Sequence, residues 1–162
     1  MNQLTFSENY TIRPATNADS QVIQQIVSTV LAEYSLPFKP ESKDSDLADI
    51  RRCYFDNGGF FGVLVDSADG NIVGSFGLYR SSAESAELRK MYLVQEVRGR
   101  GCGRLMLEYA IQAAREMGCR KVCLETLDVL KEAVFLYRKF GFIEVPVKEV
   151  NDRVDRAFEL EL

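Results

Sequence analysis

The feature that most constrains this chain is a glycine-rich turn, Arg98-Gly99-Arg100-Gly101-Cys102-Gly103, between a strand-like run and a helix-like run. Residues 87–94 before the turn are typical of a strand, and residues 104–117 after it carry apolar side chains at helical spacing. Glycine at alternate positions lets the backbone turn tightly and expose consecutive N–H groups on one concave surface. The order strand, glycine turn, helix indicates a fold that contains both α and β structure.

The same turn predicts a site for a phosphate group. The helix that follows adds unpaired N-terminal amides and the positive end of its dipole. Arg98, Arg100 and Arg104 add full positive charges, and arginine suits bidentate contact with phosphate oxygens. We therefore interpret the segment as a pyrophosphate cradle, and a glycine turn flanked by solvated arginines is the alternative.

Two other phosphate-binding motifs fit this turn less well. A P-loop ends in Gly-Lys-Ser or Gly-Lys-Thr, and this turn does not. The dinucleotide-binding fingerprint needs a third glycine at the position where Arg104 stands. The turn therefore predicts phosphate binding without assigning it to either class.

Composition excludes several classes of function. The 162 residues contain no histidine, which removes Ser/His/Asp and Cys/His nucleophilic sites and two-histidine metal sites. The four cysteines lack the paired spacing of a zinc site, so we expect no metal. A net charge of −4 disfavours nucleic-acid binding. No apolar run approaches the roughly 18 residues of a membrane span, and the first ten residues do not resemble a signal peptide, so we expect a cytoplasmic protein without a membrane partner.

The distribution of charge is uneven along the chain. Residues 1–50 carry seven acids against three bases, whereas residues 98–121 carry six bases against two acids. An acidic protein with one basic segment suggests a localised anion site. A basic helix face that only balances the acidic half is the alternative.

Periodicity over the rest of the chain predicts a single mixed α/β (α+β) domain that spans residues 1–162. No repeat or low-complexity tract divides it, and the stretch 35–45, with Pro37 and Pro40, is interpreted as a mobile loop. Thr16 and Asp19 have capping-box spacing ahead of an apolar helical run. Further helices are expected at 46–55, 104–117 and 131–140, and strands at 10–14, 60–65, 72–78, 87–94, 121–126, 142–147 and 157–162.

The turn fits the pattern Arg-x-x-Gly-x-Gly, and three further segments accompany it. They are Thr11-Ile12-Arg13-Pro14-Ala15, Glu87-Leu88-Arg89-Lys90-Met91-Tyr92-Leu93 and Ala133-Val134-Phe135-Leu136-Tyr137-Arg138-Lys139-Phe140-Gly141-Phe142. Together they resemble the GCN5-related N-acetyltransferase (GNAT) family over most of the chain. The resemblance implies a central mixed, mostly antiparallel sheet of about seven strands, with a splayed parallel pair and flanking helices.

This resemblance also implies acetyl-CoA as co-substrate and transfer of its acetyl group to a primary amine by direct attack in a ternary complex. In the family, the strand before the turn bulges and parts from its parallel neighbour, here residues 121–126, and the thioester lies in that gap. A bulge leaves an amide unpaired, and an amide near Leu93 is placed to stabilise a developing oxyanion. The implied cofactor-binding residues are Met91, Tyr92, Leu93, Arg98, Gly99, Arg100, Gly101, Cys102, Gly103 and Arg104.

Two catalytic residues follow from the same resemblance. Tyr137 matches the family's helix tyrosine, which returns a proton to the departing thiol; packing against the cofactor is the alternative role. The amine must also lose a proton before it attacks. Glu87 matches a position that sometimes takes this proton through water, and Glu125 on the neighbouring strand is the alternative base. Each carboxylate can instead be an ordinary partner in a salt bridge.

The acceptor is less well defined by the sequence. In the family, substrate contacts come from the first helices and nearby loops, and our candidates are Glu33, Tyr34, Arg80, Arg89 and Glu125. The acidic stretch 44–49 is compatible with a cationic amine and equally with a solvated helix N-terminus. The arginines favour an acceptor that bears a carboxylate. Small-molecule and protein amines both stay open, as do monomer and homodimer, which is frequent in the family.

Two other functions fit the same resemblance. One is a non-catalytic module that binds CoA or acyl-CoA, and the other is a transferase of a longer acyl group. The chain also departs from the family at one position. Many members have asparagine seven residues before the helix tyrosine, where this chain has Leu130. This departure weakens the assignment of polar cofactor contacts to residues 126–130.

Overall fold

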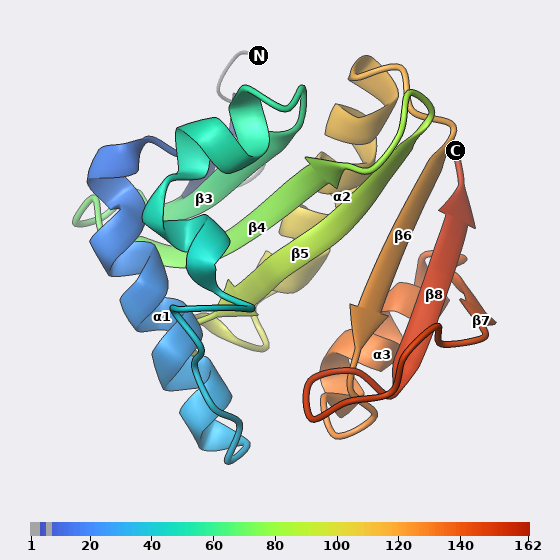
Figure 1. The fold of residues 1–162 in the computed structure, drawn as a ribbon. Helices are drawn as coiled ribbons and strands as arrows, with labels where there is room; N and C mark the ends of the chain where they lie inside the picture. Colours follow the sequence, from blue (N-terminus) through green and yellow to red (C-terminus); the bar gives the residue numbers. More distant parts are fainter. Residues whose placement is uncertain (1–3, 6–7) are drawn as a thin grey trace.

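The computed structural model describes residues 4–5 and 8–162, which contain an eight-stranded sheet (Figure 1). Only β5 and β6 pair in parallel, so the expected mostly antiparallel sheet with one parallel pair is confirmed. The strand beyond the expected seven or so is the short β1. In order across the sheet the strands are β1 (Leu4–Thr5), β2 (Tyr10–Pro14), β3 (Phe60–Asp66), β4 (Ile72–Arg80), β5 (Ser85–Leu93), β6 (Lys121–Thr126), β8 (Arg156–Glu161) and β7 (Ile143–Val145).

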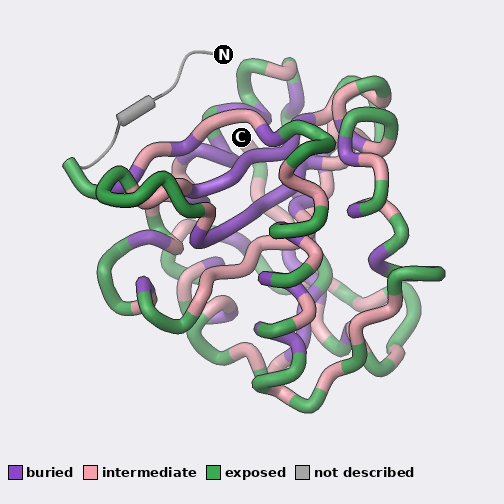
Figure 2. Tube along the Cα trace, turned by 90° about the vertical axis from the view of Figure 1, so that its left-hand side faces the viewer, coloured by how far each residue is buried: buried purple, intermediate pink, exposed green. Residues whose placement is uncertain are grey.

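Helices cover both faces of this sheet. The helix α1 (Ser20–Glu33) and the short turns η2 (Ser45–Ala48) and η3 (Arg51–Phe55) lie on one face (Figure 1). The helices α2 (Cys102–Glu116) and α3 (Lys131–Lys139) lie on the other. Each face has its own cluster of buried apolar side chains. Buried backbone accordingly concentrates in the strands between these layers, and the surrounding loops are exposed (Figure 2).

Local sequence explains where α1 begins and which face it buries. The predicted capping box is confirmed, because the Thr16 amide donates to the Asp19 carboxylate at 2.8 Å. The apolar residues behind it recur at intervals of three and four, so they share one side of the helix. The members of this stripe that are buried are Ile23, Ile26, Val27, Val30 and Leu31.

The parallel pair β5 and β6 joins only at its beginning. Three residue pairs are in register, and the last is Glu87 opposite Cys123. Both strands continue beyond this pair, but they separate, and Figure 1 shows them forming a V that opens away from it. The backbone groups of β5 that face β6 are therefore not used in the sheet beyond residue 87.

A β-bulge distorts β5 within this open part. The register with β4 runs from Gly77 opposite Arg89 to Ser75 opposite Tyr92, so β5 uses one more residue than β4. Lys90 takes the extra position with a φ of +54°, a conformation that side chains rarely adopt. The Ser75 hydroxyl donates to the Lys90 carbonyl at 2.8 Å and holds the bulge from β4.

Two predicted elements differ from the structure. Residues 46–55 form the two turns η2 and η3 instead of one helix, because Asp49 between them is extended, with a φ of −142° and ψ of 82°. Its carboxylate accepts a hydrogen bond from the Arg52 amide at 3.1 Å, which begins the second turn. The predicted strand 142–147 pairs only as β7, because Pro146 has no N–H to donate to a ladder.

Candidate active site

The glycine-rich turn enters α2 with a row of unused amides. Gly99 and Gly101 have φ values of +73° and +81°, which glycine adopts at no steric cost. Within the part of the chain that the structure describes, no amide from residue 99 to residue 104 donates to a backbone carbonyl. The first amide to do so is that of Leu105, which donates to the Gly101 carbonyl at 3.0 Å. Such a concave row of donors at the start of a 15-residue helix suits an anion.

Arg98 uses its guanidinium inside the protein. It donates to both carboxylate oxygens of Glu33 at the end of α1, at 2.6 and 3.1 Å. It also donates to the Leu93 carbonyl at 2.8 Å. Arg98 therefore fastens α1 to the end of β5, and Glu33, a candidate substrate contact, is its partner.

Arg100 and Arg104 lie at the surface of the turn. The Arg104 guanidinium donates to Glu108 one helical turn further on, at 2.8 Å, and both side chains are exposed. The Arg100 guanidinium lies 3.4 Å from the Tyr10 hydroxyl. These two cations lie beside the row of amides, and their contact with a phosphate stays a prediction.

A cleft leads from the turn into the gap between β5 and β6. Its walls come from β5, the first turn of α2, and α3. Gly103 lies in its lining, and a Cβ added there would make ordinary van der Waals contacts with Leu136 and Leu93, at 3.5 and 3.7 Å. Met91 and Tyr92 line the same cleft, so the structure brings the predicted β5 residues together with the turn. We refer to it as the cofactor-side cleft.

The backbone of β5 offers a hydrogen-bond donor to this cleft. The Val94 amide donates to the Val73 carbonyl on β4 at 3.0 Å. Because N–H groups alternate in direction along a strand, the Leu93 amide points the other way, into the gap. The Leu93 carbonyl, which shares that direction, is the one that Arg98 holds. Within the described part of the sheet, the Leu93 amide is thus free of a partner, and its role as an oxyanion donor stays a prediction.

Tyr137 lines the cofactor-side cleft from α3. Its ring packs on Phe142 and Phe158, with centroids 5.7 and 6.3 Å away. Burial, and to a smaller extent the nearby Tyr92, raises the pKa of the Tyr137 phenol. The hydroxyl therefore keeps its proton at neutral pH, and the same shift makes it a weaker acid than a phenol in water.

A second cleft opens on the α1 face of the same gap, and we refer to it as the acceptor-side cleft. Glu87 and Glu125 line it from the two separating strands. The Glu87 carboxylate accepts a hydrogen bond from Arg89 at 2.8 Å, and the Arg89 guanidinium lies 4.1 Å from the centre of the Tyr79 ring. Arg89 and Glu125 also line the cofactor-side cleft, so the two clefts meet in the gap.

Three of the candidate substrate residues do not line the acceptor-side cleft, namely Glu33, Tyr34 and Arg80. Arg80 donates to backbone carbonyls, among them those of Gly58 and Ala83 at 3.1 and 2.8 Å, and does not line either cleft. Tyr34 lines the cofactor-side cleft instead. The Cys102 side chain is buried in the core beneath the turn, and burial raises the pKa of its thiol. Only its backbone faces the predicted phosphate site.

Sequence reasoning missed a cluster of charged residues at the open end of the gap. Asp44 is fully buried and binds both Lys90 and Arg153. The stretch 35–45, predicted to be a mobile loop, is anchored in the structure through this carboxylate. Its sequence shows two prolines and several polar residues, so nothing local distinguishes the buried aspartate from its exposed neighbours.

The bulge did leave a signal in the sequence. Apolar residues that face α2 alternate regularly at Ala86 and Leu88, and the next ones are Met91 and Leu93, one residue out of phase. A strand that keeps one face buried changes phase only at a bulge. The charged Lys90 occupies the position that an uninterrupted strand would have turned into the core.

Comparison with known proteins assigns a family. The model of the acetyltransferase (GNAT) family matches residues 24–142 of this chain. An uncharacterized N-acetyltransferase of Escherichia coli, YjgM, is 33% identical over 136 residues, which are 81% of this chain and 80% of that protein. The chain belongs to the GNAT family. Its relatives are named N-acetyltransferases and the family's fold is that of acyltransferases, so this GNAT protein is an acyltransferase.

Further relatives agree with this assignment. An uncharacterized N-acetyltransferase of Schizosaccharomyces pombe is 28% identical over 127 residues, 76% of each chain. A GNAT-family acetyltransferase from Staphylococcus aureus superposes with a TM-score of 0.86 at 21% identity, over 94% of this chain and 98% of that one. A putative acetyltransferase from Salmonella typhimurium, solved with its cofactor acetyl-CoA, has a TM-score of 0.75 at 20% identity, over 95% and 94% of the chains. These structures show that the GNAT fold is shared.

Among residues 4–5 and 8–162, none of the helices has the length and apolar character needed to cross a bilayer.

Proposed function

We propose that this GNAT protein transfers the acetyl group of acetyl-CoA to a primary amine. The observation that carries the proposal is the row of unused amides at residues 99–104, of which Gly99 and Gly103 line the cofactor-side cleft. Those donors, with Arg100 and Arg104 beside them, suit a diphosphate. The cleft runs from Gly99 and Gly103 toward the gap, as a narrow chain attached to the diphosphate would require. The similar Salmonella structure with acetyl-CoA supports the choice of co-substrate.

The residues in the gap then divide the reaction between them. The co-substrate supplies a thioester carbonyl, and the Leu93 amide is placed to stabilise the negative charge that develops on its oxygen. Glu87 takes a proton from the amine through water, while Arg89 orients the carboxylate. Glu125, on the opposite strand, is the alternative base. Tyr137 donates its phenolic proton to the leaving sulfur. Attack is direct, so no covalent enzyme intermediate forms, and proximity supplies much of the rate.

The binding half of the proposal is tested by calorimetry. CoA and acetyl-CoA titrated into the purified chain are expected to bind with comparable affinity, since both carry the diphosphate. Absence of heat with either one, on protein that is shown to be folded, would reject the site.

The catalytic half is tested with Tyr137→Phe. Thiol release from acetyl-CoA is followed with glycine, lysine, spermidine and phenethylamine as acceptors. We expect turnover to fall at least about tenfold in the variant, as for loss of a general acid, while the affinity for acetyl-CoA changes little. Turnover close to that of the wild-type chain would leave Tyr137 with a packing role only.

Two alternatives are distinguished by the same material. Mass spectrometry of the purified chain identifies any acyl-CoA that remains bound and gives the length of its acyl group. A longer acyl group would favour transfer of that group, and tight CoA binding without thiol release for any amine would favour a binding module. In either case the amide row keeps its role.

A further inference from the structure

A buried ion cluster joins three distant segments on the acceptor side of the gap. Asp44, from the loop between α1 and η2, has a fully buried side chain. Its carboxylate accepts hydrogen bonds from Lys90, in the bulge of β5, and from both terminal nitrogens of Arg153, at 3.1 and 3.2 Å. The Lys90 and Arg153 side chains are 7% and 9% exposed. We call these three residues the Asp44 tie.

The tie is more completely bonded than a surface ion pair. The Lys39 amide donates to the Asp44 carboxylate at 2.8 Å, and the Lys90 ammonium also donates to the Lys43 carbonyl at 2.9 Å. Asp46 lies 3.4 Å from that ammonium, so two carboxylates balance the two cations. Opposite charges that are removed from water attract each other strongly, and a buried charge that has lost its partner destabilises the fold.

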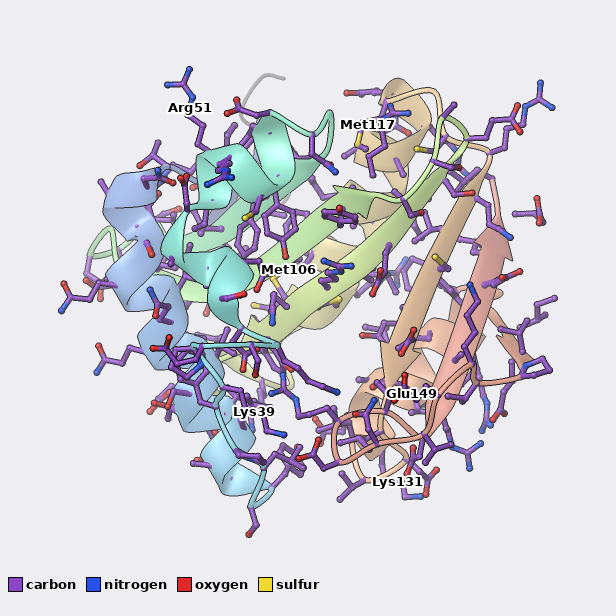
Figure 3. All side chains as sticks on the ribbon, viewed as in Figure 1. Lys39, Arg51, Met106, Met117, Lys131 and Glu149 are labelled. Carbon is purple, nitrogen blue, oxygen red and sulfur yellow. The ribbon has the colours of Figure 1, made fainter. Side chains whose placement is uncertain are left out.

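The position of the tie gives it a geometric consequence. Strands β5 and β6 are held together at the closed end of the V by three residue pairs, and beyond these they separate. Arg153 lies in the loop that precedes β8, on the far side of the gap from Lys90. Figure 3 shows Lys39 and Glu149, from the two loops concerned, on opposite sides of the open end. On the acceptor side, the tie therefore spans the V where the sheet does not.

The reacting groups of the proposed function lie on these two separated halves. The Leu93 amide belongs to β5, whereas Tyr137 belongs to α3, whose ring contacts include Phe158 on β8. The distance between an oxyanion donor and a general acid must be held closely, because a displacement of about 1 Å can cost roughly a hundredfold in rate. Lys90 also lies within the bulge that turns the end of β5.

We propose that the Asp44 tie sets the width of the gap and so positions the Leu93 amide relative to Tyr137. This inference rests on the proposed function. Asp44 is then a positioning residue, because it lines neither cleft and acts through the two halves that it joins. Lys90 lines both clefts and Arg153 lines the acceptor-side cleft, so Asp44→Asn is the variant that breaks the tie without altering a cleft lining. The ion pairs and hydrogen bonds of the tie run among its members and to residues outside the glycine-rich turn. We therefore expect the tie to affect the chemical step and to leave binding of the CoA diphosphate unchanged.

The test compares Arg153→Gln with the wild-type chain. This variant leaves Asp44 paired with Lys90, so no buried carboxylate is left alone. Three quantities are measured: kcat with the best amine of the glycine, lysine, spermidine and phenethylamine panel, the Kd for CoA by calorimetry, and amide hydrogen exchange. We expect kcat to fall roughly tenfold or more, the Kd to stay within about twofold, and exchange to quicken in residues 36–44 and 147–155.

Asp152→Asn is the matched control. It removes the exposed ion pair between Lys39 and Asp152, which joins the same two loops, and a screened pair of that kind contributes little. We expect kcat and exchange to remain close to wild type. Asp44→Asn provides a second break in the tie from the other loop and is expected to lower kcat in the same way while CoA still binds.

Three results would overturn the positioning role. One is a kcat for Arg153→Gln within about twofold of wild type, whatever the exchange shows. The second is a loss of CoA affinity as large as the loss of kcat, which would indicate general disruption. The third is unchanged exchange in both loops. If the wild-type chain acetylates none of the amines, the proposed function fails, and exchange alone decides whether Arg153 ties the loops.

Discussion

The two sides of the gap are built by different means. On the cofactor side, the proposed binding elements are main-chain amides from six consecutive residues and the start of one helix. On the acceptor side, three charged side chains from segments up to 109 residues apart meet in one buried cluster. A site made from backbone depends on local conformation, whereas a cluster of charges depends on the whole fold. Substitutions on the acceptor side should therefore mainly lower stability, whereas substitutions on the cofactor side should mainly lower the affinity for CoA.

The largest expected effect is the loss of stability in Asp44→Asn. The substitution leaves the Lys90 and Arg153 cations buried with a neutral amide, and removing one partner from a buried pair costs about 3–5 kcal/mol. Urea unfolding followed by circular dichroism measures this cost. A change below about 1 kcal/mol would show that the acceptor side is no more dependent on its charges than an ordinary surface.

Lowering the pH should remove much of the difference in stability between wild type and Asp44→Asn. Burial of Asp44 opposes its ionisation, but hydrogen bonds from Arg153, Lys90 and the Lys39 amide together lower its pKa to about 2. A carboxyl with a lowered pKa stabilises the folded state above its unfolded pKa, and that contribution is lost as the pH falls toward 2. The difference in unfolding free energy between wild type and Asp44→Asn is therefore expected to shrink by about 2 kcal/mol between pH 5 and pH 2. A difference that does not change with pH would contradict the stabilising role of the Asp44 carboxylate.

On the cofactor side, Gly101→Ala tests the role of backbone conformation. A side chain at a φ of +81° costs about 1–2 kcal/mol, and relaxation of the turn would re-aim its amides. We expect the Kd for CoA to rise about tenfold, equivalent to about 1.4 kcal/mol. Gly70→Ala is the control, because Gly70 has a φ of +77° in the β3–β4 turn and open space around it. It should lose similar stability and keep CoA affinity; equal losses of affinity would remove the turn's special role.

The smallest expected effect is that of Glu108→Gln beside the same turn. The Arg104–Glu108 pair is exposed, with side chains 65% and 38% accessible, so breaking it should cost no more than about 0.5 kcal/mol. CoA affinity should hold or improve slightly, because Arg104 no longer has a competing carboxylate. Thermal unfolding and calorimetry measure both quantities. A loss comparable to that of Asp44→Asn would erase the contrast between exposed and buried charges.

The sequence predicts the glycine-rich turn and the helix after it because the patterns that indicate them lie in neighbouring residues. The glycines at 99 and 101, the helix behind them and the order of segments each follow from neighbouring residues. Asp44 and Arg153 carry no such signal, since their meeting depends on two loops that the fold brings together. The ends of two secondary-structure elements were also missed. Asp49 breaks a helix with its own side chain, and Pro146 ends β7 early. The change of phase in the apolar pattern around Lys90 is present in the sequence and predicts the bulge.

The V between β5 and β6 also bears on how the protein avoids unwanted association. An unpaired strand edge readily recruits a strand from another molecule. Here the unpaired edges lie in the middle of the sheet, with α2 and α3 on one face and the loops joined by Asp44 on the other. The molecule can thus offer main-chain donors to a slender ligand from the interior of its sheet, apart from the edge strands β1 and β7.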